Sequence, residues 1–205
     1  MSDFIIGVTG GVASGKSVVT RRFGELGIIV ADADVAARAA VAPGSDGLAE
    51  VVALFGNEVL AAGGGLDRAA MRQRVFGDDA ARRRLEAIIH PRVRLALQEA
   101  CLKAPGPYAI AAIPLLAEGG GRDAYPWLAR ILVVDVPVAL QRARLMMRDG
   151  ADAALAERMI AAQATRTGRL GIADDVLVND GPLEALDAPI AALDRRYRAL
   201  AAAGV

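Results

Sequence analysis

The sequence predicts an α/β fold with a mostly parallel five-stranded sheet and helices on both of its faces. Short, continuous apolar runs recur along the 205-residue chain, as expected of strands that are covered on both sides. Helical stretches separate these runs, and strands that alternate with helices form mostly parallel sheets. A glycine-rich loop lies between the first apolar run and the first helical stretch. These three observations together indicate a three-layer domain.

In the first half of the chain, two strands are followed by a long helical region. The strands are expected at 4–9 (FIIGVT) and at 28–34 (IIVADAD), with a helix between them. A mostly helical stretch then runs from Val35 to Leu102, interrupted at two glycine-rich segments. The pair His90-Pro91 predicts a break between two helices, because a residue before proline disfavours the helical conformation.

The second half contributes three more strands and two arginine-rich helices. The apolar runs at 108–116, 129–136 and 175–179 predict the strands. The arginine-rich helices are expected at Val138–Arg148 and Ala153–Thr165, and a terminal helix is expected from Pro182 to Ala203.

The composition excludes several classes of protein. Apolar residues make up 54% of the chain, enough for a sizeable core, and 24 acidic residues balance 24 basic ones. This balance does not favour a nucleic-acid-binding or polybasic membrane-binding surface. Cys101 is the only cysteine, so no internal disulfide is expected. The start of the chain lacks a secretion signal, and the apolar run 108–117 is about half of the ~20 residues that span a bilayer. We expect a cytoplasmic protein.

The segment Gly10–Ser17 matches G-x-x-x-x-G-K-[S/T], the pattern of a phosphate-binding loop. Glycines let such a loop curl until successive backbone N–H groups point at an anion. The helix that follows presents its positive dipole end to the phosphates. Lys16 reaches the β- and γ-phosphates, and the Ser17 hydroxyl can ligate Mg²⁺. The pattern predicts a nucleoside triphosphate and leaves the phosphate acceptor undefined.

Two acidic residues, Asp32 and Asp34, follow the second predicted strand. Ligands of open parallel sheets bind at the carboxyl ends of the strands. Both side chains face the same side if the strand continues through them. A carboxylate there can accept the proton of an attacking hydroxyl or help hold Mg²⁺. Asp is also a favoured N-cap, so a capping role for the next helix stays open, and both roles can hold.

Six blocks of the sequence follow one another in the order GVTGGVASGKS, DADVAAR, LDRAAMRQRVFGDDAARRRLEAIIHPRV, IPLLAE, QRARLMMRDG and IAAQATRTGRLGIADDVLVNDG. In this order they resemble the dephospho-CoA kinase family. The resemblance spans nearly the whole chain. It implies transfer of the γ-phosphoryl group of ATP to the 3′-hydroxyl of the ribose in dephospho-CoA, with Mg²⁺ as cofactor.

The resemblance also implies roles for particular residues. The catalytic residues are Asp34 as the base, Lys16, and Arg148 on a lid, with Arg144 one turn earlier as an alternative. The implied nucleotide-binding residues are Gly11, Ala13, Ser14, Gly15, Lys16, Ser17, Val18, Arg144 and Asn179, the last on the adenine side. The implied acceptor-binding residues are Asp34, Arg38, His90, Leu115, Leu116 and Glu118. From the loop pattern and the acidic pair, the expected metal ligands are Ser17 and Asp32, with Asp34 as the alternative carboxylate. For His90, a structural role at the break before Pro91 is the other interpretation.

We expect one domain over residues 1–205, with a substrate-side helical region at about 35–104 and an arginine-rich lid at about 138–170. Lid arginines can supply positive charge and exclude water on closure. Each of them can equally lie on a solvated helix face; they are Arg142, Arg144, Arg148, Arg158, Arg166 and Arg169. The expected partners are ATP and dephospho-CoA, without nucleic acid or membrane, in a monomer or small homo-oligomer.

Three residues depart from the family pattern. Ala13 replaces a usual glycine, and its methyl group is tolerable at negative φ but costly at positive φ. Val18 replaces a usual threonine, which removes one possible hydroxyl contact with phosphate. Ala117 replaces a usual phenylalanine, so looser packing is expected near the acceptor.

Two alternative functions use the same loop. One is another nucleoside or nucleotide kinase of this architecture, which the blocks around Asp34 and His90 argue against. The other is a regulatory nucleotide-binding module without catalysis. A GTP switch is disfavoured because neither lysine, Lys16 or Lys103, lies in an N-K-x-D motif.

Overall fold

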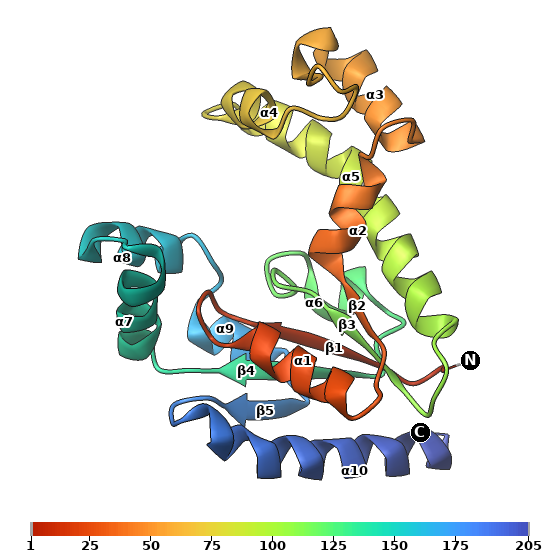
Figure 1. Cartoon of the computed structure of the whole chain (residues 1–205), viewed down its shortest axis with the longest axis vertical. Helices are drawn as coiled ribbons and strands as arrows, with labels where there is room; N and C mark the ends of the chain where they lie inside the picture. The colour runs from red at the N-terminus through yellow and green to blue at the C-terminus, as the bar shows by residue number, and fades with distance from the viewer. Residues whose placement is uncertain (1, 205) are drawn as a thin grey trace. The chain divides into compact units, whose positions relative to one another are not determined.

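Five strands form one sheet in the order β2-β3-β1-β4-β5 (Figure 1). The strands are β1 (Ile5–Gly10), β2 (Val30–Asp32), β3 (Ala109–Ala112), β4 (Arg130–Asp135) and β5 (Asp175–Val178). β1 pairs in parallel with β3 and β4, and β4 pairs in parallel with β5. All residues of β1 and β3 are buried, as their continuous apolar runs predict. The predicted α/β class and mostly parallel sheet are therefore confirmed.

The structure, a computed structural model, describes residues 2–204. The chain divides into two compact units. One contains the residues up to Ala31 and those from Ala100 onward, and the other is Asp32–Glu99. Within residues 2–204, no helix has the length and apolar character that crossing a bilayer requires.

The first unit holds most of the sheet and the helices α1 (Lys16–Glu25), α6 (Gly121–Ala124), α7 (Val138–Asp149), α8 (Ala153–Ala161), α9 (Arg166–Gly171) and α10 (Asp187–Ala203), with a 3₁₀ turn at Leu183–Leu186. Residues of α1 and α10 join those of the strands in one apolar cluster. At its centre, the rings of Phe23 and Tyr108 lie 6.4 and 5.5 Å from the ring of Tyr197. These contacts anchor α1, and α1 fixes the end of the glycine-rich loop.

The third strand and the second arginine-rich helix are shorter than predicted. β3 ends at Ala112, because Pro114 has no N–H with which to continue a strand ladder. α8 ends at Ala161, and Thr165, predicted as its last residue, instead caps α9. The Thr165 hydroxyl accepts a hydrogen bond from the backbone N–H of Gly168 at 3.0 Å.

The second unit contains α2 (Ala33–Ala40), α3 (Asp46–Phe55), a 3₁₀ turn (Asn57–Val59), α4 (Arg68–Val75) and most of α5 (Asp79–Leu102). The side chains of Ser45 and Asp67 cap α3 and α4. A separate apolar cluster that includes Val51, Phe55 and Met71 forms the core of this unit.

The predicted break at His90-Pro91 is wrong, because α5 is one helix with Pro91 inside it. A proline in a helix removes one backbone hydrogen bond and disfavours the preceding turn. Packing offsets this cost: Ile88 and Ile89 contact the core of the second unit, and Val93 is buried. The Arg92 guanidinium also donates to the carbonyl of Ile88 at 2.7 Å. The exposed side chain of His90 therefore projects from a continuous helix.

Candidate active site

The glycine-rich loop follows the last residue of β1 and ends at the first turn of α1. Gly15 caps α1 with φ of 89°, a left-handed conformation that side chains rarely adopt. The N–H of Ser14 donates to the carbonyl of Gly11 at 3.0 Å. Within residues 2–204, the N–H groups of Ala13, Lys16 and Ser17 have no partner. Unpaired amides at a helix N-terminus are an anion-binding arrangement.

Ala13 has φ of 57°, the only positive φ of a non-glycine residue within residues 2–204. The sequence left two cases open for the Ala13 methyl group, and the case of a positive φ, at which the methyl group is costly, applies. A left-handed conformation costs a residue with a side chain ~1–2 kcal/mol. The loop thus has a small, localised strain at a position where the family usually has glycine.

Polar side chains from distant segments hold the backbone of the loop. Both polar groups of the Val12 backbone are bound: the Gln163 side-chain oxygen accepts from the N–H at 2.6 Å, and Gln141 Nε2 donates to the carbonyl at 2.8 Å. Asn179 Nδ2 donates to the carbonyl of Ser14 at 2.7 Å. The two glutamines were not predicted as site residues, although both lie in blocks that carry the family resemblance.

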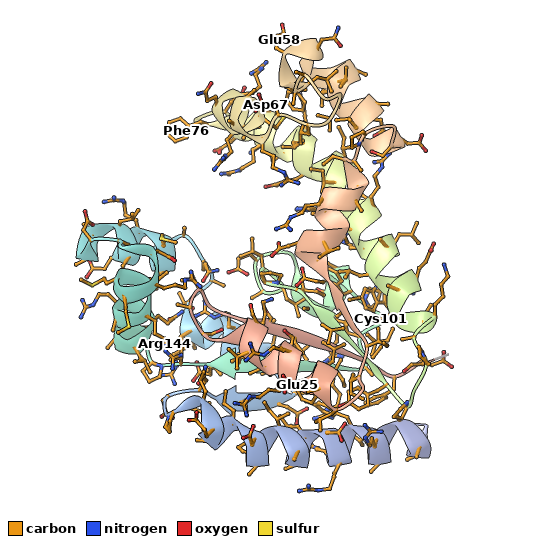
Figure 2. All side chains as sticks on the ribbon, in the orientation of Figure 1. Glu25, Glu58, Asp67, Phe76, Cys101 and Arg144 are labelled. Carbon is orange, nitrogen blue, oxygen red and sulfur yellow. The ribbon has the colours of Figure 1, made fainter. Side chains whose placement is uncertain are left out.

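The predicted lid arginines differ in their partners. Arg144, labelled in Figure 2, donates to the carbonyls of Asn179 at 3.0 Å and Ala13 at 3.5 Å, so it contacts the loop backbone. Arg148 is exposed and forms two hydrogen bonds with its neighbour Asp149, at 2.7 and 2.8 Å. This pair raises the pKa of Arg148 and lowers that of Asp149. The structure brings Arg144 and Asn179 to the loop and pairs Arg148 elsewhere.

The carboxyl end of β4, the neighbour of β1, carries Asp135. Arg166 donates to both oxygens of Asp135, at 2.9 and 2.6 Å. The Arg166 guanidinium holds the pKa of the Asp135 carboxyl below its usual range. Arg166 therefore belongs to an ion pair and not to a fully solvated face.

Three predicted acceptor-side residues follow β3 in the first unit. Glu118 accepts a hydrogen bond from the N–H of Ala164 at 2.7 Å, so it holds the segment between α8 and α9. Leu115 is 52% exposed and is free to contact a ligand, whereas Leu116 is fully buried. Leu116 lies beneath β1, where its Cδ2 would be 3.5 Å from a methyl group at Gly7. In this structure Leu116 is a core residue.

The acidic pair does not continue the second strand. β2 ends at Asp32, whose side chain accepts from the N–H groups of Asp34 at 2.7 Å and Val35 at 3.3 Å. The capping alternative is thus confirmed for Asp32, and the alternation that would align both side chains is absent. Asp34 lies in the first turn of α2, where it is exposed and its side chain has no hydrogen-bond or ion-pair partner among residues 2–204. Arg38, four residues later, lies on the same helix face.

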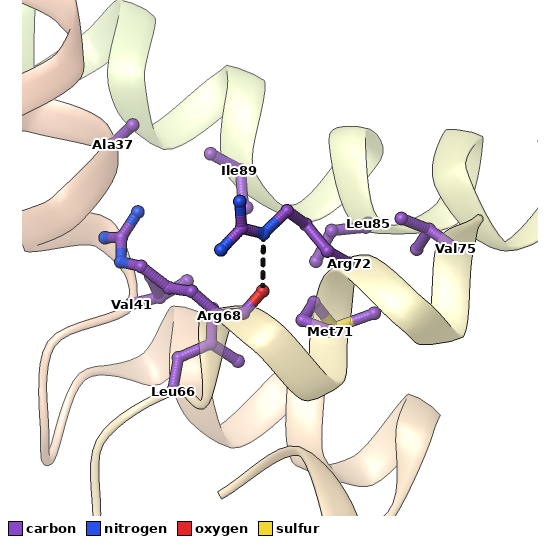
Figure 3. A pocket seen from close by; sticks show the side chains of 9 residues that line it. All are labelled: Ala37, Val41, Leu66, Arg68, Met71, Arg72, Val75, Leu85 and Ile89. Atoms are coloured by element: carbon purple, nitrogen blue, oxygen red, sulfur yellow. Dashed lines mark hydrogen bonds between the residues drawn. The ribbon is translucent and has the colours of Figure 1, made fainter. Parts of the chain in front are cut away.

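A cavity of ≈ 420 Å³ lies within the second unit and was not predicted (Figure 3). Ala37, Val41, Leu66, Met71, Val75, Leu85 and Ile89 give it an apolar lining, and Arg68 and Arg72 add positive charge. The Arg72 guanidinium donates to the carbonyl of Arg68 at 3.3 Å (Figure 3). Such a cavity suits an apolar chain that carries an anionic group.

Comparisons with known proteins identify the family of this chain. The family model described as dephospho-CoA kinase matches residues 4–185. The dephospho-CoA kinase of Xanthomonas oryzae pv. oryzae is 63% identical over 97% of this chain and 98% of its own length, and that of Xylella fastidiosa is 53% identical over 98% and 97%.

Solved structures share the fold of this chain. TT1252 from Thermus thermophilus is 33% identical, with a TM-score of 0.79 over 94% of this chain and 97% of its own. Shikimate kinase from Acinetobacter baumannii, 17% identical with a TM-score of 0.53 over 94% and 93%, shares the fold alone. The length and level of the sequence matches go beyond a shared fold: the chain belongs to the dephospho-CoA kinase family.

Proposed function

We propose that this protein transfers the γ-phosphoryl group of ATP to the 3′-hydroxyl of the ribose of dephospho-CoA, giving coenzyme A and ADP. The observation that carries the proposal is 63% identity to a dephospho-CoA kinase over 97% of the chain. The fold alone does not select the acceptor, because a shikimate kinase shares it at 17% identity. The sequence match therefore favours dephospho-CoA over other small acceptors and over a non-catalytic module.

On the donor side, Lys16 and the free amides of the loop bind the ATP phosphates. Phosphoryl transfer depends mainly on placement and charge neutralisation, which these groups supply. The Ser17 hydroxyl is exposed and without a protein partner among residues 2–204, so it fits Mg²⁺, which prefers one or two protein oxygens together with phosphates. Asp32 is the carboxylate proposed as a further metal ligand, through the oxygen that does not cap α2. Bound Mg²⁺ would neutralise charge on the phosphates.

Arg144 and Asn179 support the donor side by binding the loop backbone. Arg148 is proposed to leave Asp149 and approach the phosphates when the nucleotide is bound. Its exposed pair with Asp149 is of a kind that contributes little to stability, so exchange of partners costs little.

On the acceptor side, Asp34 is the proposed general base. Its carboxylate is exposed and unpaired within the described residues, so it is available to accept the proton of the ribose hydroxyl. Arg38 on the same helix face would bind an acceptor phosphate. His90, Leu115 and Glu118 are also proposed on this side, with Leu116 as packing support. The cavity beside Arg68 and Arg72 would take the apolar arm of the acceptor.

An acceptor-dependent assay tests the proposal. Purified protein with Mg²⁺-ATP is expected to release ADP when dephospho-CoA is added, and the product should coelute with authentic coenzyme A. Shikimate and a free nucleoside serve as control acceptors and should give only background ADP. Well-folded protein that binds ATP but forms no coenzyme A would contradict the proposal.

We further propose a cytoplasmic location and a monomer or small homo-oligomer. The location rests on the single cysteine, Cys101, which is buried in the interior. Burial raises the pKa of its thiol to about 12, so it resists oxidation.

A further inference from the structure

Arg169 is the only buried arginine within residues 2–204, with 5% of its surface exposed. It lies on α9, and its guanidinium rests against the glycine-rich loop. A methyl group at Gly11 would lie 2.7 Å from Nη2 and 2.9 Å from Cζ of Arg169. The expected solvated-face alternative therefore does not apply to this residue. Only a glycine allows so close an approach of the guanidinium to the loop backbone.

Arg169 forms no direct ion pair with a carboxylate among residues 2–204, and it acts only at longer range on Asp135, whose pKa it helps to lower. Its Nη1 donates to a neutral group, the carbonyl of Ala164. The adjacent carboxylate, Asp135, is held on both oxygens by Arg166. Lys16 of the same loop likewise lacks an ion pair in the described chain. Burying an unpaired cation is expensive unless an anion neutralises it.

We propose that Arg169 is a phosphate ligand: its guanidinium contacts the phosphate chain of the nucleotide that the loop binds. The anion supplies the partner that the buried charge lacks, and the planar guanidinium suits phosphate oxygens. This role rests on nucleotide binding by the loop and not on the identity of the acceptor. A brace that merely supports the loop through the bond to Ala164 is the competing role, and the two roles predict opposite effects on the ligand-free protein.

The test compares Arg169→Met and Arg169→Lys with the control Arg142→Met. Arg142 is exposed and pairs with Glu157 on the surface of α7 and α8. Melting temperature is measured without ligand, and dissociation constants are measured by calorimetry for ATP, ADP and inorganic pyrophosphate. Arg169→Met is expected to leave the ligand-free melting temperature unchanged or higher, because it removes an unpaired buried charge. Its affinity for ATP and pyrophosphate should fall by about tenfold or more, and the control should match wild type.

The opposite pattern overturns the proposal. A brace predicts a lower melting temperature without ligand and wild-type affinity for pyrophosphate in the protein that remains folded. If Arg169→Met does not fold, Arg169→Lys decides: several-fold weaker pyrophosphate binding at an unchanged melting temperature supports the phosphate role, and unchanged binding refutes it. None of these measurements requires dephospho-CoA, so failure of the proposed kinase reaction would be distinguished from failure of this inference.

Discussion

The glycine-rich loop and the second unit, Asp32–Glu99, differ in how many contacts their candidate functional groups make with the rest of the protein. The loop backbone is bound by Gln141, Gln163, Arg144 and Asn179, side chains that come from far along the chain. In the second unit, the candidate side chains of Asp34 and Arg38 are exposed and have no hydrogen-bond or ion-pair partners among residues 2–204. The loop backbone is thus held by tertiary contacts before any ligand binds, whereas the proposed acceptor groups are left available for a ligand. Substitutions in the two regions should therefore differ in their effects on turnover and on stability.

The largest effect is expected at Lys16 in the loop. Lys16→Met should lower kcat by ~10³-fold, because it removes a preorganised charge that stabilises the transferring phosphoryl group. The ligand-free melting temperature should not fall, since Lys16 makes no ion pair in the described chain. Steady-state kinetics and thermal melting check both expectations. If Lys16→Met turns over at nearly the wild-type rate, Lys16 has no part in the mechanism.

The next effect concerns Asp34, on the acceptor side. Asp34→Asn should lower kcat by ~10²-fold or more and leave the affinity for ATP unchanged, because only the base is lost. Asp67→Asn is the matched control, since Asp67 caps α4 and asparagine caps equally well. If Asp34→Asn turns over as fast as this control, Asp34 is not the base. It is then only an acidic residue in the first turn of α2.

How far the sequence predicts these two regions depends on whether a feature is local. The loop, the alternation of strands and helices, and capping by Asp32 follow from neighbouring residues. The roles of Gln141 and Gln163 depend on bonds to Val12 across 129 and 151 positions, which no local pattern reveals. Likewise, the local rule for Pro91 predicts a helix break, but the packing of Ile88 and Ile89 outweighs it. The φ of Ala13 is also set by the folded loop and not by its own preference.

The two glutamines offer a test of the preorganised loop. Gln141 is fully buried, and Gln141→Leu leaves the Val12 carbonyl without its donor. The free energy of unfolding should fall by ~1–2 kcal/mol. Because Gln163 binds the same residue, the double variant Gln141→Leu/Gln163→Leu should lose less than the sum of the single losses. Denaturant titrations of the four proteins measure this coupling, and simple additivity would show that the glutamines act independently.

A smaller, pH-dependent effect is expected at Asp135. Its pKa is lowered by Arg166, so the pair stabilises the fold fully above the unfolded pKa of ~3.9. This contribution is lost as the pH falls through the folded-state pKa. Arg166 is half exposed, so screening keeps the contribution modest. The melting temperature of Asp135→Asn should lie below that of wild type at neutral pH and converge with it in acid. A difference that stays constant with pH would exclude the ion pair as its cause.

The smallest effect is expected at Ala13, and it has the opposite sign. Ala13→Gly removes the ~1–2 kcal/mol cost of the left-handed conformation at φ of 57°. Glycine also adds ~0.5–1 kcal/mol of chain entropy to the unfolded state, so the net gain should be about 0.5–1 kcal/mol. For a chain of this length, the melting temperature should rise by ~1–4 °C. Ala162→Gly, at φ of −73°, is the matched control and should lower the melting temperature, because no strain is relieved there. If both variants are destabilised alike, Ala13 is not strained, and the conformation of the loop has no local cost in free energy.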